Sequence, residues 1–127
     1  MTPIVVGLGG ALGALTRYYG TEFVRRLVGD SLPWGTFAVN IIGAFALGFL
    51  MVWLQSRAPS TQVRQFIGIG FLGSFTTFST FSYETVAMAR EGHFWQAGGY
   101  AASSMAFGIV AVVAGAVIAS TLSPAGN

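Results

Sequence analysis

Charged residues are scarce in this chain, and their positions divide it into four long apolar spans. Only 8% of its 127 residues are charged, whereas a soluble domain carries about 25%. The spans cover roughly residues 3–26, 33–55, 63–89 and 95–122, and each is near the roughly 20 residues that a membrane-spanning helix needs. The sequence therefore predicts an all-α integral membrane protein, a single membrane domain over residues 1–127 with four transmembrane helices. The charged residues are Arg17, Glu22, Arg25, Arg26, Asp30, Arg57, Arg64, Glu84, Arg90 and Glu91.

Several classes of function find no support in the composition. The net charge is only +2, without lysine and without a basic run, so nucleic-acid binding is not indicated. The absence of cysteine removes disulfides, thiolate metal sites and cysteine nucleophiles. Residues 68–73 match G-x-G-x-x-G, but they lie in an apolar span with no strand before them, so no nucleotide site is predicted. With His93 in a loop and Glu84 alone in its span, an enzyme is not predicted either.

The third span carries hydroxyl groups where a membrane helix is ordinarily apolar. Residues 73–82 read Gly-Ser-Phe-Thr-Thr-Phe-Ser-Thr-Phe-Ser, and hydrocarbon offers those hydroxyls no partner. On a continuous helix Thr76, Thr80 and Glu84 would form one polar stripe. A polar stripe ending in an acid indicates a permeation path. The positive ring edges of Phe78 and Phe81 could meet an anion, or the two rings could serve only in packing.

Gly73 leaves the course of the third span open. A glycine followed by Ser74, Thr76 and Thr77 invites a helix break that frees backbone carbonyls at membrane depth. The alternative is a continuous helix whose hydroxyls bond back to carbonyls one turn earlier. Spacing alone favours neither.

The arginines give almost no signal for orientation. In a four-span chain Arg57 and Arg64 lie on one side, and Arg25, Arg26 and Arg90 on the other. The positive-inside rule normally produces a clear excess on one side. The near balance is compatible with insertion in both orientations, or with Arg25 and Arg26 deciding the orientation alone.

The remaining spans hold few polar residues. Asn40 follows Thr36 by four positions, so both share a helical face, and the amide could bind an anion or bridge two helices. Tyr100 and Ser104 are spaced in the same way on the fourth span. Arg17 could reach an interface or draw anions into a vestibule. The 18 glycines, concentrated in the spans, predict close helix packing.

Three motifs follow one another along the chain. They are Gly7-x-Gly9-Gly10-Ala11-Leu12-Gly13-Ala14-Leu15-x-Arg17, Gly35-Thr36-x-x-x-Asn40-x-x-Gly43 and Gly70-x-x-Gly73-x-x-Thr76-Thr77-Phe78-Ser79-Thr80-Phe81-Ser82. Together they resemble the Fluc (CrcB) family of fluoride channels over essentially the whole length, and the third motif is the most specific. The resemblance implies a dual-topology homodimer of two antiparallel subunits in the lipid of a bacterial inner (plasma) membrane. Each subunit would be multi-pass with its third helix broken near the middle, and the dimer would export fluoride passively through two pores.

The resemblance also implies roles for particular residues. Phe78 and Phe81 would form an aromatic box, Asn40 would lie on the ion path and Arg17 near a vestibule. A structural sodium ion at the dimer centre would be held by the backbone carbonyls of Gly73 and Thr76 from both subunits. Ser74 departs from the family, which commonly has a second glycine there. The family's polar track is matched by Thr36, Ser79, Thr80, Ser82, Glu84, Tyr100 and Ser104.

Two alternatives differ in class from a fluoride channel. A small multidrug exporter is also a short dual-topology dimer, but it needs an acid deep in its first helix, and residues 1–21 contain none. A structural membrane subunit, or another small dual-topology transporter, remains the alternative that the pattern does not remove.

Overall fold

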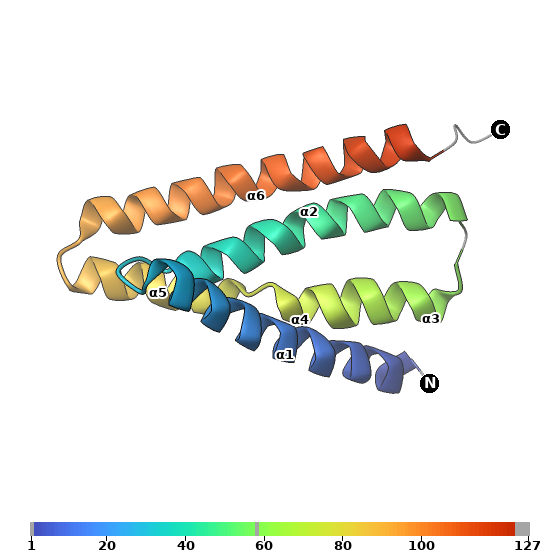
Figure 1. Cartoon of the computed structure of the whole chain (residues 1–127), viewed down its shortest axis with the longest axis horizontal. Coiled ribbons are helices and arrows are strands. Elements are labelled where there is room, and N and C mark those ends of the chain that lie inside the picture. Colours follow the sequence, from blue (N-terminus) through green and yellow to red (C-terminus); the bar gives the residue numbers. More distant parts are fainter. Residues whose placement is uncertain (1, 58, 124–127) are drawn as a thin grey trace.

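The computed structural model describes residues 2–57 and 59–123, and this part of the chain contains helices and no strand (Figure 1). Three helices are long: α1 (Thr2–Val28), α2 (Trp34–Arg57) and α6 (Phe94–Leu122). The third segment consists of four pieces: α3 (Thr61–Arg64), the π-helix η1 (Gln65–Leu72), α4 (Gly73–Phe75) and α5 (Phe78–Arg90). The helices run along the long axis of the molecule, and α1 begins at the end where α6 finishes (Figure 1). The predicted all-α class is confirmed.

Two of the helices, α2 and α6, are long and apolar enough to cross a membrane by themselves. Their most apolar windows have mean hydropathies of 2.2 and 2.3, and only 22% and 17% of those windows is buried. Apolar helices that bury so little are typical of a protein whose solvent is lipid rather than water. This is a membrane protein. The other two predicted spans are less clearly long, apolar helices. Helix α1 carries the charged residues Arg17, Glu22, Arg25 and Arg26, and the third segment is interrupted.

Glycines set the closest helix contacts. A Cβ on Gly70 of η1 would lie 2.7 Å from the carbonyl oxygen of Val6 on α1. Gly48 of α2 and Gly115 of α6 likewise face the backbone of the opposite helix. The predicted packing role is confirmed at these positions, whereas a Cβ on Gly108 would meet nothing within 4 Å among the described residues.

The third segment breaks between α4 and α5. Thr76 (φ −83°, ψ 155°) and Thr77 (φ −147°, ψ 117°) are extended, so the continuous helix is excluded. The predicted polar stripe of Thr76, Thr80 and Glu84 on a continuous helix is therefore wrong at Thr76. The Thr76 hydroxyl bonds back to the carbonyl oxygen of Leu72 at 3.0 Å, and only Thr80 and Glu84 share α5.

The π-helix η1 has no counterpart in the sequence interpretation. Its eight residues, Gln65–Leu72, lie directly before α4 and pack along α1. Runs of π-helix this long are rare, and π-helical turns are frequent near functional sites. The segment contains Gly68 and Gly70, and Gly70 permits the close approach of α1.

Candidate functional site

The helix break is held from α2 by the side chain of Asn40. Its Nδ2 donates to the Thr77 carbonyl oxygen at 3.0 Å, and the Thr77 N–H donates to Asn40 Oδ1 at 2.7 Å. The Asn40 amide thus pairs with both backbone polar groups of Thr77, the N–H and the C=O, as a neighbouring β-strand would. Of the two roles considered for Asn40, the bridge between helices is present. One Nδ2 hydrogen is left beyond this pair, on a side chain that lines a groove.

Two carbonyls at the break lose their usual helical partners. The N–H four residues after Gly73 belongs to Thr77 and is bonded to Asn40. The N–H four residues after Thr76 belongs to Thr80 and points at the Thr77 hydroxyl, 3.3 Å away. The carbonyl oxygens of Gly73 and Thr76 are therefore free of the α-helical bond that would occupy them. Carbonyl oxygens are the ligands that a hard cation takes, so the residues present fit a sodium ion.

A groove of about 430 Å³ runs beside the break. Helices α2, α5 and α6 and the residues around the break line it together. Its polar or aromatic lining residues are Asn40, Thr76, Thr77, Phe78, Phe81 and Ser104. The structure thus brings six residues of different helices to one concave surface.

The two phenylalanines of α5 have different surroundings. Their ring centroids are 5.9 Å apart at 42°. Phe81 also meets the ring of Tyr100 on α6, edge to face at 5.1 Å and 67°. Phe78 is 79% exposed. The chain therefore fixes Phe81 by packing and leaves Phe78 on an open face.

Beyond Phe81, polar groups of α2, α5 and α6 converge. Thr36 is buried, and its hydroxyl donates to Glu84 Oε1 at 2.6 Å. Both residues also line a second cavity of about 350 Å³ at the α1–α2 connection. The Tyr100 hydroxyl and Ser104 Oγ are buried without a hydrogen-bond partner among the described residues. Buried polar atoms are normally satisfied, so unpartnered hydroxyls need an explanation.

Other predicted site residues are not gathered into this arrangement. Ser79 and Thr80 are exposed on α5, although Thr80 is linked to the break because the Thr77 hydroxyl donates to Thr80 Oγ1 at 3.1 Å. Ser82 Oγ donates to the Phe78 carbonyl oxygen at 2.9 Å, within its own helix. Arg17 is half-buried on α1 and lines neither of the two cavities described above.

Thr77 is the residue that the sequence interpretation undervalued. The sequence pattern assigns it no role beyond its place in a stretch that invites a helix break, yet it is buried, pairs with Asn40 and caps α5 through its side chain. The signal was available, because threonine before a helical run is a favoured N-cap.

Comparisons with known proteins agree with the motifs. Residues 4–116 match the family model "CrcB-like protein, Camphor Resistance (CrcB)". The fluoride-specific ion channel FluC of Geotalea daltonii is 53% identical over 92 residues, which cover 72% of this chain and 74% of that one. The proteins of the same name from Geobacter sulfurreducens (42% over 122 residues, 95% and 98% covered) and Dehalococcoides mccartyi (41% over 120 residues, 94% and 92% covered) match almost end to end. The chain belongs to the CrcB family.

Proposed function

We propose that this protein is a fluoride-selective ion channel that lets fluoride leave the cell passively and so lowers its cytoplasmic concentration. Its membership of the CrcB family and its similarity to proteins named fluoride-specific ion channels support this proposal. The observation that carries it is the groove at the helix break. There an amide, two aromatic rings and the buried, unpartnered hydroxyl of Ser104 come together from three helices.

The groove offers what a dehydrated small anion needs. Fluoride is a strong hydrogen-bond acceptor, so it requires donors in place of water. The Ser104 hydroxyl and the second Nδ2 hydrogen of Asn40 are such donors in the groove, and the unpartnered Tyr100 hydroxyl is a further donor one turn earlier on α6. The ring edges of Phe78 and Phe81 add partial positive charge without a hydrogen bond. The Thr36 hydroxyl occupies an oxygen of Glu84, which reduces the repulsion that a bare carboxylate would exert on an anion.

An inverted second copy of the chain is the proposed partner. Phe78, Ser79, Thr80 and Gly73 are all exposed in one subunit, and hydroxyl groups facing hydrocarbon are costly. Another copy over this face would cover them and close the open groove into a pore. The balanced arginines permit the opposite insertion that an antiparallel dimer requires. We infer four membrane crossings per subunit, by α1, α2, the α3–α5 segment and α6, in the bacterial inner membrane.

Sodium is the proposed structural ion of this dimer. The carbonyl oxygens of Gly73 and Thr76 would hold it together with the same atoms of the partner. When bound, it would supply positive charge that links the subunits and lowers the cost of bringing an anion into the membrane.

A growth assay tests the function in the cell. Expression in a bacterial strain that lacks fluoride export should restore growth in fluoride. The double substitution Phe78→Ile, Phe81→Ile should abolish this rescue while the protein still reaches the membrane as a dimer. Rescue that is undiminished in the double variant would contradict the proposed path.

The absence of native cysteine makes the dimer testable with one thiol per subunit. Gly73→Cys should cross-link to a dimer on oxidation, because Gly73 is exposed and a Cβ there meets nothing closer than 3.8 Å in its own subunit. Gly98→Cys, on open surface near the start of α6, is the control and should stay monomeric on denaturing gels. Cross-linking of Gly98→Cys without Gly73→Cys would overturn the proposed interface.

A further inference from the structure

The end of α1 carries a positively charged cluster that the proposed channel does not use. A hollow of about 630 Å³ lies on the outer face of this helix. Its lining residues are Tyr18, Tyr19, Glu22, Phe23, Arg25 and Arg26, all from α1. We propose that this surface, the α1 cluster, binds the phosphate of an anionic phospholipid headgroup.

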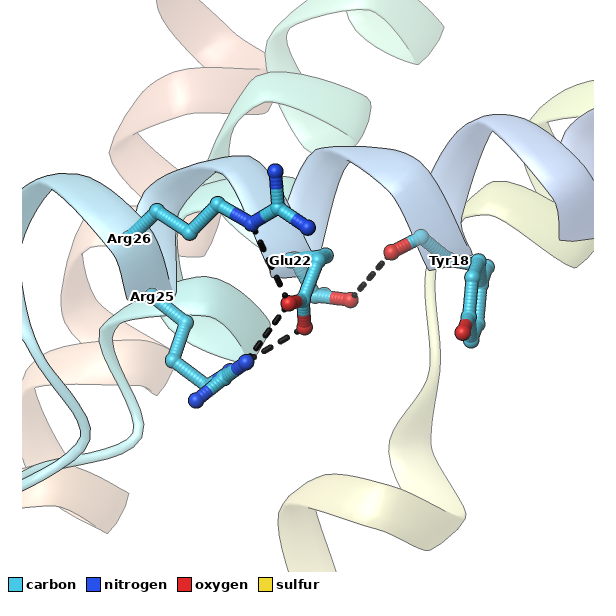
Figure 2. A network of polar contacts seen from close by, with 5 residues as sticks. Tyr18, Glu22, Arg25 and Arg26 are labelled. Carbon is cyan, nitrogen blue, oxygen red and sulfur yellow. Dashed lines mark hydrogen bonds and ion pairs between the residues drawn. The ribbon is translucent and has the colours of Figure 1, made fainter.

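Two arginines share a single carboxylate in the α1 cluster (Figure 2). Arg25 Nε donates to Glu22 Oε2 at 3.0 Å, and its Nη2 donates to Oε1. Arg26 reaches the same carboxylate only through Nε, at 3.3 Å. The cluster therefore keeps a net charge of +1. The terminal nitrogens of Arg26 make no hydrogen bond to the described residues, and the side chain is 76% exposed. A planar guanidinium with free donors matches the oxygens of a phosphate.

The position of the α1 cluster along the helix suits a headgroup. Helix α1 has 27 residues, which at about 1.5 Å per residue gives a length of about 40 Å. The hydrocarbon core is only about 30 Å thick. Charged side chains are costly in the hydrocarbon, and Arg25 and Arg26 lie in the last turn of α1, so the surplus length projects at this end when α1 crosses the membrane. Tyr18 and Tyr19 then lie near the boundary, where such amphipathic rings are enriched.

An apolar stripe leads along α1 to the α1 cluster. Its members recur every three or four residues, and each is at least 50% exposed. Acyl chains can lie along this stripe while the headgroup meets the arginines. The opposite face of α1 packs on η1 through Gly9 and Gly13, so the stripe is the side left for lipid. It consists of Ile4, Leu8, Leu12, Leu15, Tyr19 and Phe23.

Native mass spectrometry of the full-length protein tests the inference. The protein is released from micelles doped with phosphatidylglycerol or with phosphatidylcholine of the same acyl chains. We expect phosphatidylglycerol to be retained preferentially. One charge near a membrane surface is worth about fivefold in binding, so Arg26→Gln should lower retention about fivefold. Glu22→Gln should raise it by a similar factor, since it removes the competing carboxylate. If the cluster had only a structural role, Arg26→Gln and Glu22→Gln would not change lipid retention in opposite directions.

Two variants serve as controls. Arg26→Lys keeps the charge and should keep most of the retention. Arg57→Gln removes the same charge at the far end of α2, where the guanidinium lies 3.9 Å from the Trp53 ring, and should have no effect. If Arg57→Gln lost as much lipid retention as Arg26→Gln, the lipid would be held by diffuse electrostatic attraction, which would contradict a specific site at the α1 cluster.

Three further results would also contradict the proposal. Displacement of phosphatidylglycerol by inorganic phosphate would identify a free-anion site instead. Equal retention of the two lipids would exclude headgroup selectivity. If Arg25→Gln, Arg26→Gln converts dimers to monomers without changing lipid retention, a second copy covers this face. Fluoride flux is measured separately in phosphatidylcholine vesicles, so failure of this inference leaves the proposed channel intact.

Discussion

Among the described residues, Asn40 is the one side chain of α2 that hydrogen-bonds to the helix break, and replacing it by alanine removes this support. Both hydrogen bonds to Thr77 disappear, at 3.0 and 2.7 Å. Each is worth about 1 kcal/mol net, so the open break loses about 2 kcal/mol, or roughly thirtyfold in its population. The Thr77 N–H is then free to return to the Gly73 carbonyl one turn earlier. That hydrogen bond would restore the helix across the break and occupy the Gly73 carbonyl oxygen, which is a proposed sodium ligand.

The assay is fluoride efflux from liposomes at several sodium concentrations. Asn40→Ala should lose about thirtyfold in flux at low sodium. High sodium should restore part of this flux, because an ion that binds only the open break stabilises it by mass action. Ser103→Ala is the matched control, since that hydroxyl bonds only within α6. Flux in Asn40→Ala equal to the wild type would refute the reasoning. A loss that sodium does not relieve would show that Asn40 acts on the anion instead of on the break.

Three further predictions follow from the same geometry. Phe78→Ile and Phe81→Ile should each reduce fluoride flux about tenfold, because the side chain stays large and apolar while roughly 1–2 kcal/mol of attraction between ring edge and anion is lost. Unchanged flux in both variants would mean that the two rings serve only in packing. Gly70→Ala should destabilise the subunit by about 1–3 kcal/mol, since its Cβ would lie 2.7 Å from an α1 carbonyl oxygen. Gly73→Ala should fold normally and weaken only the dimer; thermal unfolding measures the first effect and gel filtration the second. C-terminal reporters should detect both orientations in comparable amounts, and two lysines added to the α2–α3 loop should fix one; a wild-type chain in a single orientation would contradict the antiparallel dimer.

The apolar helices were predictable because their signal is local. The scarcity of charge and the length of the spans are properties of consecutive residues, and α2 and α6 show them most clearly. The packing role of glycine was also accessible, because small residues are the main means of close helix approach in lipid. Gly108 shows the limit, since whether a glycine meets a neighbour depends on where that neighbour lies.

The course of the third segment could not be chosen from spacing. Thr76 bonds back to Leu72 as it would in a continuous helix, yet the backbone is extended there. What decides between the two is Asn40, which lies 37 positions earlier in the sequence than Thr77. A local pattern contains no information about such a distant hydrogen-bond partner. The role of Thr77 as a cap, in contrast, could have been found from the N-cap preference.

The candidate site was only partly accessible for the same reason. Four-residue spacing correctly put Thr36 with Asn40 and Tyr100 with Ser104, each pair on its own helix. The contacts between helices, such as that of Thr36 with Glu84, needed the fold. The π-helix η1 had no sequence signal at all, because its residues are equally compatible with an α-helix. Whether Arg17 lies in a vestibule remains a prediction, since that vestibule would involve the partner.

Anion efflux from vesicles tests the central claim most directly. The purified protein is reconstituted in liposomes loaded with fluoride or with chloride, and a potassium ionophore balances the charge. We predict rapid passive loss of fluoride, with no added energy source, and little loss of chloride over the same time. Retention of fluoride in vesicles that contain folded protein, or equal loss of the two anions, would contradict the proposal of a fluoride-selective channel.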